Sequence, residues 1–193
     1  EWEAQMTTMA FVLVAQLLAP TPVPTAAPLL GYGPWHLGMS RDEVTAVSAF
    51  GPYSPVRVTG GLETRNGVFA DQKTNISFAF GDRGLRMIQI WAYEGRDRKD
   101  AVAAFYRVYQ HLEKAHGAVE TDLRGVPVRA DSVQFSEPVQ RFLSAVPPGR
   151  AAKIQLSPVE KSPGIKIFSS LMTQPQLGYY YVFLYYVTPQ RPT

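Results

Sequence analysis

The segment LGYYYVFLYYVTP, residues 177–189, constrains the fold more than any other part of this chain. Every residue from Tyr179 to Val187 is either apolar or a tyrosine. Successive side chains of a strand point to opposite faces of a sheet, so a strand without a polar face has to be covered on both sides. We therefore predict a central strand here, with one face in the core and the other face under a helix of this chain or under a partner.

The two faces of this strand carry different side chains, and one of them is a candidate binding surface. If helices of this chain cover both faces, both sets belong to the core. If they cover one face, the other set forms an aromatic surface of the kind enriched where proteins bind one another. The candidate partner-binding residues are Tyr179, Tyr181, Phe183 and Tyr185, and the opposite face carries Tyr180, Val182, Leu184 and Tyr186.

Alternating apolar residues and turn signals predict the other strands. The clearest pattern is a β-hairpin over residues 74–93 that turns through Gly-Asp-Arg-Gly and returns through Ile88, Ile90 and Trp91. A turn at Glu-Lys-Ser-Pro separates two more strands from each other, and a turn at Gln-Pro-Gln separates the second of them from the last strand. The further predicted strands are residues 151–159 and 164–173, with short ones at 56–58 and 67–69 around a Gly60-Gly61 turn.

The stretch WHLGMSRDEVTAVSAFGP, residues 35–52, predicts a helix of about three turns. Ser40 and Glu43 form a capping box, and Met39 and Val44 stand at the positions of a hydrophobic staple. Gly51 and Pro52 supply the stop, with Gly51 as the C′ glycine. A helix this short is unstable alone, so it has to dock on a larger surface.

Two more helices follow. The longer one has apolar residues at steps of three and four, with Asp97 as N-cap and Gly117 as C′ glycine. The shorter one is predicted to start at an N-cap Ser136 and to stop at Pro147-Pro148. Between these helices, from Gly125 on, the pattern predicts a strand.

The order is then helix, hairpin, helix, strand, short helix and three strands. Without strand-helix-strand crossovers, this order predicts an α+β fold, a largely antiparallel β-sheet with two or three helices packed on one face. A helix followed by strands occurs twice. We expect one domain over residues 29–189 and a short tail at 190–193.

The N-terminal residues 1–28 have a different character. An apolar run from Met9 to Ala19 would rise about 16 Å as a helix, too short to cross a membrane but typical of a signal peptide. The proline-rich linker PTPVPTAAP follows it. We expect a signal peptide and a periplasmic or secreted protein. The alternatives are an N-terminal helix docked on the domain or a partner, and a membrane anchor, which would make the protein membrane-associated.

Composition excludes several kinds of site. The chain has no cysteine, which excludes disulfides, thiol nucleophiles, cysteine zinc sites and a lipid-modified cysteine. Its net charge of +3 comes from scattered basic residues rather than a run that could neutralise successive phosphates, so we expect no nucleic-acid partner.

No constellation of residues requires catalysis. His111 and His116 are five residues apart on a helix and diverge by about 140°, so they do not share a metal as an i, i+4 pair would. His36 is interpreted as a structural histidine, and Ser40 as a helix cap rather than a nucleophile. We therefore expect no catalytic, cofactor or metal site, and no cofactor.

At LGMSRDEV, followed by a glycine-proline stop and a β-hairpin, the chain resembles small bacterial α+β domains. This class is typified by β-lactamase-inhibitor protein and the small lipoprotein of the outer-membrane barrel-assembly machinery, and similar openings occur in small predicted immunity proteins. The resemblance covers residues 37–91, and it implies helices on an antiparallel sheet that binds another protein. The chain lacks the lipoprotein's cysteine and does not repeat the motif, so no functional residue carries over.

The sequence thus favours an exported, non-enzymatic protein-binding module of a bacterial envelope or secretome. Two alternatives remain open. One is an immunity-like or inhibitor protein, and the other is an accessory subunit of a larger membrane or envelope complex with an ordered N-terminal apolar segment. The oligomeric state is left open.

Overall fold

The computed structural model describes residues 30–189 and has the predicted α+β fold. Eight antiparallel strands form one sheet in the order β3-β4-β5-β6-β10-β9-β8-β7, and β1 and β2 form a separate two-stranded sheet. The strands are β1 (Gly31–Tyr32), β2 (Trp35–His36), β3 (Tyr53–Val56), β4 (Gly61–Phe69), β5 (Gln72–Gly81), β6 (Gly84–Gly95), β7 (Val119–Thr121), β8 (Lys153–Pro158), β9 (Lys166–Gln174) and β10 (Tyr179–Val187). The helices are α1 (Arg41–Thr45), the 3-10 helix η1 (Ser48–Phe50), α2 (Arg98–His116) and α3 (Ser132–Ala145).

The sheet consists of two halves that each follow a helix. The first half is α1 followed by β3 to β6, and the second is α2 followed by β7 to β10, with α3 inserted after β7. The last strands of the two halves, β6 and β10, pair with each other in the middle of the sheet. The predicted central position of the last strand is therefore confirmed.

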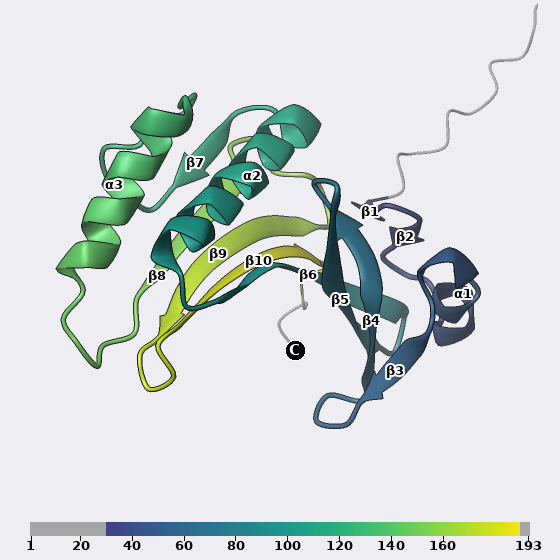
Figure 1. Ribbon diagram of the computed structural model, residues 1–193. Coiled ribbons are helices and arrows are strands. Elements are labelled where there is room, and N and C mark those ends of the chain that lie inside the picture. The colour runs from purple at the N-terminus through teal and green to yellow at the C-terminus, as the bar shows by residue number, and fades with distance from the viewer. Residues whose placement is uncertain (1–29, 190–193) are drawn as a thin grey trace, which may run out of the picture.

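All the helices lie on one side of the sheet. In Figure 1 the sheet bends into an arch, with α2 over β9 and β10 and α1 beside β4 on the outer side. The buried apolar side chains of both halves form one cluster between the helices and the sheet. The cluster is continuous across the two halves because buried residues of neighbouring strands lie side by side. Ile76 of β5 lies opposite Ile90 of β6, and Ile90 lies opposite Leu184 of β10.

Helix α1 begins as predicted but ends earlier. Ser40 and Glu43 form the capping box, and both Met39 and Val44 are buried. The chain leaves the helical conformation at Val47, whose carbonyl accepts a hydrogen bond from the Tyr53 hydroxyl at 2.9 Å, and the 3-10 helix η1 follows. Two parts of the prediction are therefore wrong, since α1 has five residues and Gly51 has a φ of −70°.

Helix α2 matches the prediction at both ends. The Asp97 side chain accepts hydrogen bonds from the amides of Lys99 and Asp100, and Gly117 has the positive φ of 78° that glycine tolerates best. Its apolar side is buried against β6 and β10. Phe105 of this helix contacts Phe135 of α3 with 5.5 Å between ring centroids, which joins the two helices.

Helix α3 starts four residues before the predicted N-cap. Asp131, not Ser136, is the N-cap, because Asp131 and Gln134 form a complete capping box. Pro138 then lies inside the helix. The strand predicted from Gly125 is also misplaced, because the strand between the helices is β7, which ends at Thr121 and pairs with β8.

Most of the remaining strands agree with the patterns that predicted them. The hairpin is β5 and β6, the segments 151–159 and 164–173 match β8 and β9, and residues 67–69 belong to β4. The predicted strand 56–58 is misplaced, because only Val56 belongs to β3 and residues 57–60 form the turn to β4. No helix within residues 30–189 has the length and apolarity needed to cross a membrane. The predicted signal peptide, linker and tail lie outside the described residues and stay predictions.

Candidate functional site

The four candidate residues of β10 lie together on the face of the sheet that the helices leave open. We call Tyr179, Tyr181, Phe183 and Tyr185 the aromatic row and the face that carries it the open face. The opposite side chains of the strand belong to the core, whereas no member of the row does. The three tyrosines are only partly buried, and Phe183 is 8% exposed.

The rings of the aromatic row pack on one another along the strand, which reduces their exposure to solvent. Neighbouring centroids are 6.0 Å apart for Tyr179 and Tyr181, 5.7 Å for Tyr181 and Phe183, and 5.8 Å for Phe183 and Tyr185. This mutual packing explains why Phe183 is nearly inaccessible without any helix above it. The row is therefore a continuous aromatic surface rather than four isolated rings.

Two residues that were not among the predicted partner-binding residues widen this surface. Trp91 of β6 meets Phe183 edge-on at 4.9 Å between centroids, and Phe168 of β9 stacks on Tyr185 at 4.6 Å. Strand periodicity could have found Trp91, because it follows the buried Ile90 and so points to the other face. Phe168 alternates with Ile167 in the same way.

Polar side chains between the rings orient the aromatic surface. The Gln89 amide donates a hydrogen bond to the Tyr185 hydroxyl at 3.3 Å, and the Trp91 indole N–H donates one to the Ser77 hydroxyl at 3.2 Å. Burial raises the pKa of Tyr185, and burial together with the nearby Glu94 raises that of Tyr181. Both hydroxyls are therefore protonated at neutral pH and can donate hydrogen bonds.

Charged residues flank the aromatic row. The Arg96 guanidinium lies 5.1 Å from the Tyr179 ring centroid at one end, and the Lys166 ammonium lies 5.0 Å from the Phe168 ring at the other. Lys153 stands opposite Met172 beside the row, and Glu94 stands opposite Tyr181. All four charged side chains are exposed.

A cleft of about 250 Å³ borders this surface at the point where β5 and β6 separate. The β5–β6 ladder ends at Ile76 and Ile90, and the cleft opens beyond that pair. Asn75 and Trp91 are among its lining residues, and the buried Asn75 side-chain oxygen has no hydrogen-bond partner among the described residues. This cleft is large enough for one side chain of a bound molecule.

The histidines of α2 are part of the packing on the helix side. His111 Nε2 is 3.2 Å from the Tyr186 hydroxyl, and the His116 ring lies 6.3 Å from the Tyr186 ring. Burial lowers the pKa of both histidines, which favours their neutral forms. Within residues 30–189, no group of three or more histidine, aspartate or glutamate side chains is arranged to hold a metal ion.

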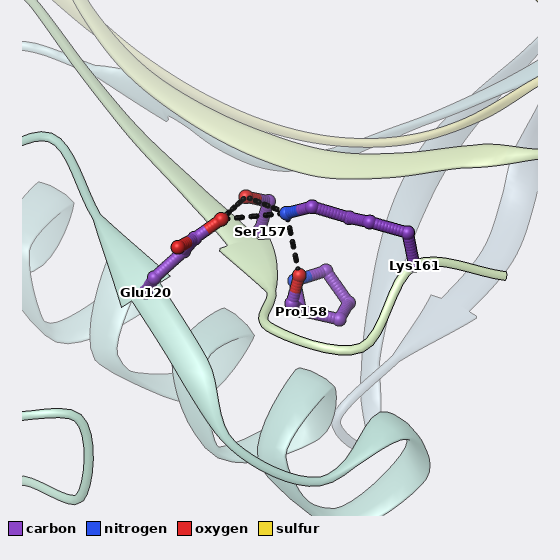
Figure 2. A network of polar contacts seen from close by, with 4 residues as sticks. All are labelled: Glu120, Ser157, Pro158 and Lys161. Carbon is purple, nitrogen blue, oxygen red and sulfur yellow. Dashed lines mark hydrogen bonds and ion pairs between the residues drawn. The ribbon is translucent and has the colours of Figure 1, made fainter.

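One serine lies next to a lysine, and Figure 2 shows the network around them. The Lys161 ammonium donates hydrogen bonds to Glu120 Oε1 at 2.6 Å, to Ser157 Oγ at 3.2 Å and to the Pro158 carbonyl at 2.7 Å. Three acceptors use the three hydrogens of an ammonium group, and the Ser157 hydroxyl itself donates to Glu120. The cluster therefore ties β7 to the end of β8.

Comparisons of the chain with protein-family models, with curated proteins and with solved structures found no match.

Proposed function

We propose that this chain is a non-enzymatic protein-binding module that uses the open face of its sheet. The observation that carries the proposal is the aromatic row, which no element within residues 30–189 covers. Aromatic side chains supply much of the binding energy of protein interfaces. The row also lies on β10, a central strand paired on both sides, so its rings are held in place before binding.

We propose a non-enzymatic protein because the side chains that could act in catalysis have structural roles in this fold. Ser40 caps α1, Ser157 belongs to the Lys161 network, and the buried Ser169 hydroxyl donates a hydrogen bond to the Phe183 carbonyl at 2.7 Å. His111 contacts Tyr186 in the core. Each of these groups is explained by folding.

The proposal includes export to the periplasm or the medium of a bacterium. It rests on the apolar run from Met9 to Ala19 and the proline-rich linker. Mass spectrometry of the protein purified from its own organism tests this part. We expect a mature chain that begins near residues 26–30, and a chain that retains residues 9–19 would contradict export with cleavage.

Affinity capture tests binding through the open face. Wild type and the variant Tyr181→Ala/Tyr185→Ala are used as baits in extracts of the producing organism, after circular dichroism has shown that both are folded. We expect proteins captured by wild type to be lost from the double variant. The control Val133→Ala removes an exposed apolar side chain from α3, on the helix side, and should capture the same proteins as wild type.

Identical capture by wild type and by the double variant would refute a role for the open face. Crosslinking adds a second readout, because a photoreactive group introduced at Met172, beside the row and 37% exposed, should label the captured protein. The same group at Val133 should not label it.

A further inference from the structure

The open face carries an unbalanced charge around the aromatic row. Arg96, Lys166 and Lys153 border the row, and Glu94 is the acid paired across from it. The one ion pair within residues 30–189 joins Lys161 to Glu120, so none of the three cations forms an ion pair with a carboxylate of the described residues. Free in water, such exposed cations are well solvated.

Binding at the row would remove two of these cations from water. Arg96 and Lys166 lie over rings at about 5 Å, so a protein that covers the rings covers the charges as well. Burying an unpaired charge costs more free energy than an aromatic ring returns by cation–π attraction. A partner therefore needs carboxylates opposite both cations to avoid this cost.

The strand sets the distance between the two charged ends. Tyr179 lies under Arg96, and Phe168 under Lys166 is the neighbour of Tyr185 across the sheet. Tyr185 is six residue steps from Tyr179 along β10, which corresponds to about 20 Å at the rise of a strand. Between them lie Tyr181 and Phe183, which present an apolar surface.

From this arrangement we propose that the partner is a protein with an acidic recognition surface, in which two carboxylate groups about 20 Å apart flank apolar side chains. This inference rests on the proposed function, since it describes the partner of the same open face. The carboxylates pair with Arg96 and Lys166, and the apolar side chains pack on the rings between them. Lys153, two strands from the row at the level of Tyr181, adds positive potential on the β8 side.

Single-stranded nucleic acid is the competing ligand, because it also combines negative charge with stacking groups. It fits the open face less well. A nucleic-acid backbone carries a charge at every nucleotide, whereas the two cations that touch the rings stand at the two ends and Lys153 lies two strands away from the row. Glu94, opposite Tyr181, would face the phosphates between the two ends. An oligonucleotide therefore enters the test as an alternative outcome.

The test starts from a random library of displayed peptides about 12 residues long, which can span 20 Å in an extended conformation. The library is selected on the full chain, and enriched peptides are synthesised and titrated against variants. We expect aspartate or glutamate on both sides of apolar residues. Arg96→Glu and Lys166→Glu should each weaken these peptides about tenfold or more. The control Arg141→Glu, an equal charge change at an exposed site on α3, should change binding less than about twofold.

Other outcomes separate this inference from the proposed function. Peptides that depend on Tyr181 and Tyr185 but show no acidic enrichment would overturn the acidic partner and leave protein binding in place. A library without any peptide that depends on these tyrosines would overturn both. Binding of a labelled oligothymidylate that both charge reversals abolish would overturn the acidic protein in favour of nucleic acid.

Discussion

Replacing Tyr109 with phenylalanine should destabilise the protein through a single buried hydroxyl. Tyr109 is 1% exposed on α2, and its hydroxyl donates a hydrogen bond to the Val128 carbonyl at 3.0 Å and accepts one from the Ala130 amide at 2.8 Å. These two bonds hold the irregular segment between β7 and α3 against the core. Tyr109→Phe keeps the ring and removes both bonds.

The magnitude follows from the surroundings of the two freed groups. Val128 is 51% exposed, so water can replace the hydroxyl at its carbonyl at little cost. Ala130 is 8% exposed and its amide would lose its partner in a buried place, which costs about 1–3 kcal/mol. For a domain of this size, about 2–4 °C per kcal/mol gives a fall in Tm of about 2–12 °C.

Urea unfolding of wild type and variant, followed by far-ultraviolet circular dichroism, measures the change. Tyr106→Phe is the matched control, because Tyr106 stacks on Tyr109 at 5.9 Å but its hydroxyl has no hydrogen bond within the described residues. We expect the control to lie within about 0.5 kcal/mol of wild type. If Tyr109→Phe is no less stable than this control, the argument that the hydroxyl holds the segment is refuted.

Three further predictions concern other parts of the fold. Ser40→Ala should lower the free energy of unfolding by about 1 kcal/mol in urea, because the capping box of α1 is lost; a variant as stable as wild type would contradict the role of the cap. Gly84→Ala should destabilise the protein by more than about 1 kcal/mol, because Gly84 has a φ of 89° and an added Cβ would overlap the Gly38 carbonyl oxygen. Gly81→Ala in the same turn is the control and should cost less, because its Cβ would meet the flexible Arg86 side chain. Burial lowers the pKa of His111 and His116 in the folded state, so their contribution to stability is full above the ordinary histidine pKa of about 6.5 and is lost as the pH falls toward the lowered values. Unfolding of wild type should therefore become easier between about pH 7 and 5. His111→Gln/His116→Gln should flatten this dependence, and a slope equal to that of wild type would show that other groups cause it.

Local signals explain which parts of the fold the sequence predicts well. The capping box of Ser40 and Glu43 lies within one turn, and the 81–84 hairpin turn pairs residues close in sequence. The continuous apolar character of β10 likewise predicts its central position without knowledge of its neighbours. These features depend on a few adjacent residues, which is why they are visible in a single sequence.

The predicted helix ends are wrong where two N-cap signals compete in the sequence, or where a residue outside the helix determines its end. Asp131 and Ser136 are both good N-caps, and Asp131 prevails because Gln134 completes a capping box with it. Helix α1 ends early because Val47 is held by Tyr53 from the neighbouring strand. Neither outcome can be derived from the helix segments alone.

The candidate site, too, is only partly predictable from local sequence. Alternation along β10 separates the aromatic row from the core residues, but it does not say which of the two faces the helices cover. That depends on α2 packing against β6 and β10, a long-range contact. The flanking cations were missed for a similar reason, since Arg96 approaches Tyr179 only because β6 and β10 pair.

The pairing of β6 with β10 also affects how the chain is made. Tyr179 is synthesised roughly 84 residues after Gly95, so at about 5–20 residues per second β6 waits roughly 4–17 seconds for its partner. During this time β6 is an unpaired edge strand that carries Ile88 and Ile90, a template for the wrong strand. The late arrival of β10 thus leaves time for a second copy to pair its own β10 with this edge, which is the geometry of a strand exchange between copies.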